Sequence, residues 1–238
     1  MFLKRNKNIG CFVIPEIPSQ SSDMAPLIHY LQTQGYFVGC PDSLTCVKPD
    51  PIAVYPFWIN SIEKSFSSFA KSCDVVIVVG FSLGGLAGVH LASKYEVDAL
   101  ITINTPAHLQ EIWNLYEKYT DVQSQRGKNI LENCIRNLSR LSLPFSNGYR
   151  DLVRAVKEKI PVLRCPILVI QGKKDTQIKW SNAYYIYEKA ASREKEIQFF
   201  PKSGHHICQD CEYKLVFIKV VQFIERVAEN RLLLQRRV

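Results

Sequence analysis

The sequence lacks long apolar runs. No stretch approaches the ~20 consecutive apolar residues that a membrane-spanning helix needs. The apolar run from Cys11 to Ile14 ends at Pro15, and it is too short for the hydrophobic region of a signal peptide, although basic residues precede it. We therefore expect neither a membrane span nor a secretion signal.

The cysteines also lack the regular spacing of a disulfide-stapled secreted domain. The eight positions are Cys11, Cys40, Cys46, Cys73, Cys134, Cys165, Cys208 and Cys211. Several fall within apolar strand patterns, which is typical of reduced thiols. This distribution predicts a cytoplasmic protein.

Blocks of one charge sign are absent as well, although the formal net charge is +8. The 30 Lys and Arg are spread along the chain, and no basic stripe is interleaved with aromatic residues, so nucleic-acid binding is not favoured. The densest basic positions lie near the two ends: Lys4, Arg5, Lys7, Arg231, Arg236 and Arg237. These positions predict solvated termini and at most a weak peripheral membrane contact.

What the sequence does contain is an alternation of short β-rich runs with segments of helical period. A length of 238 residues that are 47% hydrophobic suits one domain with a full core and one insertion. Strands are expected at 11–15, 36–41, 75–79, 97–103, 166–171 and 197–200, and helices near 23–34, 57–71 and 212–230. The near-continuous apolar character of the strands predicts an α/β fold with a mostly parallel, doubly wound sheet covered on both faces.

Residues 107–160 interrupt this alternation with three helical patterns. The segment leaves from the carboxyl edge of the sheet, where ligands bind in such folds, so we expect a helical cap. The core then comprises residues 1–106 and 161–238; the alternative is that the insertion only thickens the core. Four aromatic residues could line a pocket or fill the interior of the cap: Trp113, Tyr116, Tyr119 and Phe145.

The most informative motif is Gly80-Phe81-Ser82-Leu83-Gly84, which stands between an apolar strand and a helix rich in small residues. A serine on such a sharp strand-to-helix turn projects its hydroxyl into a cleft. The flanking glycines are expected because side chains there would collide with each other or with a neighbouring strand, and because glycine enters the left-handed region freely. The motif predicts Ser82 as a nucleophile.

A serine nucleophile needs a base, and the base needs an acid that orients it. Asp175 follows the strand at 166–171 in a tight Gly172 turn, whereas the preceding strand is followed by Asn104-Thr105-Pro106 without a carboxylate. We therefore predict Asp175 as the acid, although a turn aspartate is the ordinary alternative.

His205 follows Asp175 by 30 residues, which leaves room for one helix and one strand, and it comes directly after a Ser203-Gly204 turn. We predict His205 as the base, with His206 as its rival. The remaining histidines are expected to have surface or satisfied core roles: His29, His90 and His108.

Together the GFSLGG, QGKKD and SGH motifs, with a helical insertion between them, resemble the small bacterial carboxylesterase and monoacylglycerol-lipase-like group of α/β-hydrolases. The resemblance covers nearly the whole chain from Gly10 to the final helix. It implies acyl transfer to Ser82 followed by hydrolysis by water, with Asp175 and His205 completing the triad and no cofactor. It also implies an oxyanion hole made of the Leu83 N–H and a second N–H from the loop after the first strand.

That loop departs from the family pattern. Relatives usually carry His-Gly-aromatic there, whereas this chain has Pro15-Glu16-Ile17, which makes the Ile17 N–H the expected second donor. Ile17 precedes Pro18, which favours extended geometry. A carboxylate at Glu16 would repel a developing oxyanion, so either Glu16 points away, toward a basic neighbour, or the enzyme is slow or altered.

His205, His206, Cys208 and Cys211 superficially suggest a zinc site. A triad role for His205 removes it as a ligand, and the cysteines begin a helix that can bury them, with Asp210 as a plausible N-cap. We therefore expect neither a metal nor a redox pair.

The sequence thus predicts a serine hydrolase of small-molecule carboxylic esters, with short or medium acyl chains or monoacylglycerols as the first expectation. Nothing in it indicates an oligomeric state. Two alternatives stay open. One is a thioesterase or acyltransferase that uses the same triad, and the other is a catalytically idle binding module, which the Pro15-Glu16 substitution motivates.

Overall fold

The structure is a computed structural model that describes residues 8–16, 23–41, 54–108 and 152–235. These residues form a six-stranded sheet in the order β2-β1-β3-β4-β5-β6. The strands are β1 (Ile9–Ile14), β2 (Phe37–Gly39), β3 (Val75–Phe81), β4 (Ala99–Ile103), β5 (Ile167–Gly172) and β6 (Lys195–Phe200). Every neighbouring pair is parallel, so the predicted doubly wound sheet is confirmed.

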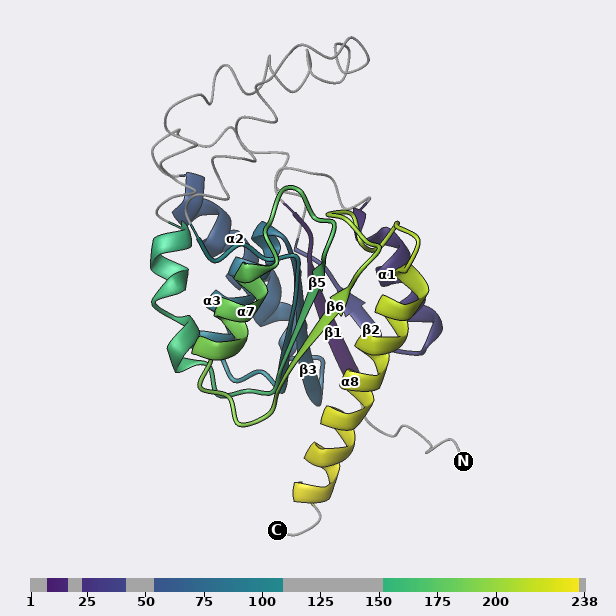
Figure 1. The fold of residues 1–238 in the computed structure, drawn as a ribbon. Coiled ribbons are helices and arrows are strands. Elements are labelled where there is room, and N and C mark those ends of the chain that lie inside the picture. Colours follow the sequence, from purple (N-terminus) through teal and green to yellow (C-terminus); the bar gives the residue numbers. More distant parts are fainter. Residues whose placement is uncertain (1–7, 17–22, 42–53, 109–151, 236–238) are drawn as a thin grey trace, which may run out of the picture.

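Helices cover both faces of the sheet (Figure 1). Helices α1 (Ala25–Thr33) and α8 (Tyr213–Gln235) lie on one face, and α2 (Val54–Ala70), α3 (Leu83–Lys94) and α7 (Ser181–Lys189) lie on the other. A short 3-10 helix, η3 (Ile160–Val162), precedes β5. Among the described residues, no helix combines the length and apolar character needed to cross a membrane.

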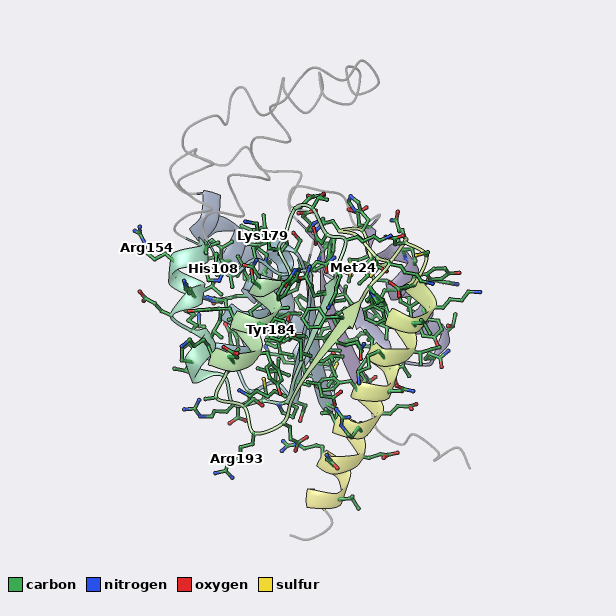
Figure 2. The ribbon with its side chains drawn as sticks, viewed as in Figure 1. Met24, His108, Arg154, Lys179, Tyr184 and Arg193 are labelled. Atoms are coloured by element: carbon green, nitrogen blue, oxygen red, sulfur yellow. The ribbon has the colours of Figure 1, made fainter. Side chains whose placement is uncertain are left out.

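The strand side chains alternate between two core layers. In β3, Ile77 and Val79 join the layer beneath α1 and α8, whereas Val76 and Val78 join the layer beneath α2, α3 and α7. This period of two explains why the strand is apolar at every position: each face carries its own helices. The side chains fill both spaces in Figure 2, where Met24 lies toward α1 and Tyr184 lies on α7.

The strand order has a switch point between β1 and β3. The chain runs from β1 outward to β2, returns to the other side of β1 as β3, and then proceeds outward through β4, β5 and β6. Ligands bind in such sheets where the order reverses, outside the carboxyl ends of the strands. The register pairs Ile14 with Gly80, so the segments after β1 and β3 emerge side by side at this point.

Most of the predicted cap lies outside the described residues, including Trp113, Tyr116, Tyr119 and Phe145. Its last part is described. Residues 152–157 are helical, as predicted, and Leu152, Val153, Val156 and Ile160 are buried in the layer that contains α3 and α7. This end of the segment therefore belongs to the core packing, while the cap itself stays a prediction.

Candidate active site

Ser82 stands at the turn between β3 and α3 with strained backbone angles, φ 51° and ψ −122°. Positive φ is unusual for a residue with a side chain, and such strain is typical of functional sites. The Ser82 N–H donates to the Ile103 carbonyl oxygen at 2.8 Å, which ties the turn to the end of β4. The serine is fully buried.

The glycines on either side of this turn are required by close backbone contact. A Cβ at Gly80 would lie 2.4 Å from the Gly84 carbonyl oxygen, and a Cβ at Gly84 would lie 2.2 Å from the Ile14 carbonyl oxygen. The predicted collision is confirmed. The expected need for left-handed backbone at these glycines is wrong, because among the described residues only Ser82, Asn104 and Gly35 have positive φ.

The predicted acid and base lie together at the carboxyl ends of β5 and β6. Asp175 Oδ2 and His205 Nδ1 are 2.7 Å apart, and both side chains are buried. The other carboxylate oxygen of Asp175 accepts hydrogen bonds from the backbone N–H groups of Gln177 and Ile178, each at 2.8 Å. These bonds fix the carboxylate as the acceptor of the His205 Nδ1–H. Nε2 lies on the opposite side of the ring, 3.6 Å from the Glu16 oxygen that contacts Ser82.

The acid and base loops are joined by Asn104, a residue that we did not expect in the site. Asn104 Nδ2 donates to the carbonyl oxygens of Gly204 (3.1 Å) and His205 (2.7 Å), while its Oδ1 accepts from the Gly172 N–H at 2.8 Å. The residue is fully buried with φ 46°. The sequence did not predict this role because the residue after β4 is an amide and not a carboxylate, although a left-handed backbone at a strand end is typical of asparagine.

Glu16 points into the site. Its Oε1 accepts a hydrogen bond from the Ser82 hydroxyl at 2.7 Å and lies 3.6 Å from His205 Nε2. The residue is only 3% exposed. Of the two alternatives left open by the sequence, the one in which Glu16 points away is therefore excluded. The carboxylate reaches the serine because β1 and β3 end side by side and Gly84 allows the Ile14–Pro15 backbone to approach.

This arrangement sets the protonation state of His205. Burial alone would lower its pKa, but the carboxylates of Asp175 and Glu16 outweigh burial and raise the pKa to about 9. At neutral pH the ring is therefore an imidazolium held between two carboxylates. Such a ring cannot accept a proton from the serine.

Of the two expected oxyanion donors, Leu83 lies within the described residues and Ile17 does not. Leu83 is the first residue of α3, and N–H groups in the first turn of a helix have no acceptor within that helix. The Leu83 amide therefore follows Ser82 in the first turn of α3, and its role as an oxyanion donor stays a prediction. Ile17 lies outside the described residues, so the second donor stays a prediction.

The other histidines occupy separate places. His206 has a half-exposed ring whose Nδ1 lies 3.5 Å from Asp23 Oδ2, so it does not share the position of His205. His29 is exposed. His90 is buried between Glu63 and Lys159, each at 2.6 Å, which confirms a satisfied core role. The ring of His108 packs edge-on against Tyr185.

The cysteines that follow the base do not join the histidines. Cys208 is buried with its sulfur 3.7 Å from that of Met24, whereas Cys211 is exposed. Within the part of the chain that the structure describes, no cluster of three or more His, Cys, Asp or Glu could hold a metal ion. Asp210 was expected to be the N-cap of α8, but α8 begins at Tyr213. The Asp210 carboxylate instead accepts the Gly204 N–H at 2.7 Å and so supports the loop that carries His205.

Comparison with known proteins finds sequence similarity to an esterase and a lipase. No family model matches the sequence. The chain is 21% identical over 218 residues to a carboxylesterase of Bacillus subtilis, covering 87% of this chain and 88% of the relative. It is 21% identical over 239 residues to a thermostable monoacylglycerol lipase of Bacillus sp. strain H-257, covering 95% and 94%.

Solved structures show the same fold. A metagenome-derived lipolytic enzyme superposes with a TM-score of 0.72 at 20% identity, covering 92% of this chain and 94% of that one. A monoacylglycerol lipase of Paleococcus ferrophilus gives a TM-score of 0.67 at 12% identity, with coverage of 92% and 94%. The chain therefore has the α/β-hydrolase fold, and its sequence is similar to those of a carboxylesterase and a monoacylglycerol lipase.

Proposed function

We propose that this protein hydrolyses carboxylic esters with Ser82 as nucleophile, His205 as general base and Asp175 as the acid that orients the base. The observation that carries the proposal is the 2.7 Å contact between Asp175 and His205 beside the strained Ser82 turn. The similarity to a carboxylesterase and a monoacylglycerol lipase supports ester bonds as the target.

In this mechanism the Ser82 oxygen attacks the ester carbonyl carbon while its proton passes to His205 Nε2. The Leu83 N–H stabilises the oxyanion, together with the expected Ile17 N–H. Collapse of the tetrahedral intermediate breaks the bond to the alcohol, which takes the proton from His205. Water, deprotonated by the same ring, then attacks the acyl-enzyme, and the carboxylic acid leaves Ser82 free again.

The resting arrangement must change before this cycle can start. The Ser82 proton is directed at Glu16 rather than at His205, and the imidazole is protonated at neutral pH. The hydroxyl therefore has to turn from Glu16 to Nε2, and the ring has to lose its proton. Both changes follow if the Glu16 carboxylate is displaced or paired with another group.

For the substrate class, the names of the relatives support carboxylic esters and monoacylglycerols, and we propose short or medium acyl chains. The helical cap expected within 107–160 would then cover the acyl chain. The reduced thiols expected from the cysteine pattern support a cytoplasmic location for the reaction.

Covalent labelling with a fluorophosphonate tests the proposal without knowledge of the substrate. The reagent needs an activated serine and an accessible cleft. We expect one adduct on Ser82 by intact mass and peptide mapping, and none in Ser82→Ala or His205→Ala. His206→Ala is the matched control and should label normally, because its ring is half-exposed and faces Asp23.

The Ser82–Glu16 hydrogen bond favours a second candidate function, that of a binding module with the hydrolase fold and no catalytic turnover. Absence of labelling in a folded wild-type protein would support that candidate and overturn the first.

A thioesterase or acyltransferase role uses the same triad. Comparing hydrolysis of oxygen esters with that of acyl-CoA separates it from esterase activity.

A further inference from the structure

We propose that Glu16 is a specificity-determining residue that selects esters carrying a cationic hydrogen-bond donor, such as an ammonium group, on the carbon next to the scissile carbonyl. This inference rests on the proposed function. It concerns the acyl part of the substrate and not the chemistry of the triad.

The first step of the argument is the position of the carboxylate. Glu16 Oε1 lies 2.7 Å from the Ser82 oxygen, which is the atom that must bond to the ester carbonyl carbon. A substituent on the adjacent carbon is only two covalent bonds from that centre. A donor placed there therefore comes within hydrogen-bond range of the carboxylate when the ester reaches Ser82.

The second step is the exchange of partners. At rest the acceptor is occupied by the Ser82 hydroxyl, and every substrate must break or replace that bond before the hydroxyl can turn to His205. A neutral alkyl group offers nothing in exchange and leaves a buried carboxylate facing apolar atoms, which is costly. An ammonium group replaces the hydroxyl with a charge-assisted bond, which is stronger than the one it displaces.

The third step concerns the base. Glu16 is one of the two carboxylates that keep His205 protonated. A cation bound to Glu16 lies close to the imidazolium and opposes its charge, so the ring releases its proton more readily. The same substrate group thus frees the nucleophile and favours the neutral form of the base.

A matched pair of esters tests this inference. Alanine and 2-methylpropanoic acid esters of the same nitrophenol differ only in an ammonium group in place of a methyl group. The measured quantity is kcat/KM of the alanine ester divided by kcat/KM of the 2-methylpropanoic acid ester. It is measured in wild type and in Glu16→Gln. Intrinsic reactivity of the two esters cancels in that comparison. Glu229→Gln, which removes an exposed carboxylate on α8, is the control for net charge.

We expect the ratio to fall by on the order of 10- to 100-fold in Glu16→Gln, which is the range for loss of a hydrogen bond to a charged group, and to stay unchanged in Glu229→Gln. The neutral ester alone should react faster in Glu16→Gln, because nothing charged holds the hydroxyl. An equal ratio in wild type and Glu16→Gln overturns the inference while leaving the esterase proposal intact.

If Ser82 labels with a fluorophosphonate but neither ester turns over, the same ratio is measured with phosphonate diesters that carry an α-amino or an α-methyl group. These reagents need only the first bond-forming step. An unchanged ratio there also overturns the inference. Failure of Ser82 to label at all, in a folded protein, overturns the proposed function and this inference with it.

Discussion

The side-chain amide of Asn104 donates to the carbonyl oxygen of His205 at 2.7 Å, and its oxygen accepts a hydrogen bond from the Gly172 N–H, just before the turn that carries Asp175. One buried residue at the end of β4 therefore sets the separation of two loops that are about 30 residues apart in sequence and that carry Asp175 and His205. The distance between acid and base depends on a side chain that takes no part in proton transfer.

Replacing Asn104 with aspartate should lower both stability and activity. The carboxylate would face the carbonyl oxygens of Gly204 and His205, which need donors, at a cost of about 1–3 kcal/mol. Urea unfolding measures the first effect. For activity, we expect a lower kcat with little change in KM, because the base is misplaced and the acyl pocket is not. Asn230→Asp, an exposed change on α8, should alter neither.

The pH dependence of activity should report the raised pKa of His205. The base works only when neutral, so kcat/KM should climb with pH up to about 9, the pKa of the ring. In Glu16→Gln one of the two carboxylates that raise this pKa is gone, and the rising limb should move to lower pH. Coincident limbs in the two proteins would contradict the part of the pKa assigned to Glu16.

The same shift predicts a pH effect on folding. A histidine whose pKa is raised in the folded state contributes stability that is fully present below its ordinary value of 6.5 and is lost as pH rises through about 9. The free energy of unfolding should therefore decline across this window. His205→Asn should flatten that decline, and chemical denaturation at several pH values would show whether it does.

Glu16→Gln should also label faster with a neutral fluorophosphonate than wild type. The hydroxyl of Ser82 is then held by a neutral amide instead of a carboxylate, and the base is more often unprotonated at neutral pH. Pseudo-first-order labelling rates give the comparison. A large loss of labelling in this variant would instead mean that the carboxylate itself accepts the serine proton.

The close contact at Gly84 makes a steric prediction. A methyl group there would lie 2.2 Å and 2.5 Å from the carbonyl oxygens of Ile14 and Pro15, both backbone atoms that cannot move cheaply. Gly84→Ala should therefore destabilise the protein by roughly 1–3 kcal/mol and displace Glu16 from Ser82. Gly204→Ala is the matched control for stability, since its nearest contact is an ordinary 3.6 Å.

Much of the fold was predictable because the central strands are continuous apolar runs in the sequence. The expected strands at 97–103 and 197–200 correspond to β4 (Ala99–Ile103) and β6 (Lys195–Phe200). Their last residues agree with the expected ones, and their first residues differ by two. In β6 the difference arises because Lys195 and Glu196 pair with β5 but carry no apolar signal.

The site was predictable as a set of residues but not as a set of contacts. Asp175 and His205 follow strands whose carboxyl ends meet, so their proximity follows from parallel topology. The direction of Glu16 does not follow, because it depends on how closely the backbone at Ile14 approaches Gly84. Asn104 was missed for a similar reason: its partners are backbone groups, which leave no mark in the sequence.

The strand order also bears on how the protein folds. Glu16 and Ser82 come from the first half of the chain, while His205 arrives with β6, the strand that is added at the edge of the sheet. Parallel pairings between distant segments form slowly, because the intervening chain must be ordered first. During synthesis the nucleophile therefore exists before its base does. The reactivity proposed for Ser82 then requires that the last strand has docked, so labelling of Ser82 would report the completion of folding.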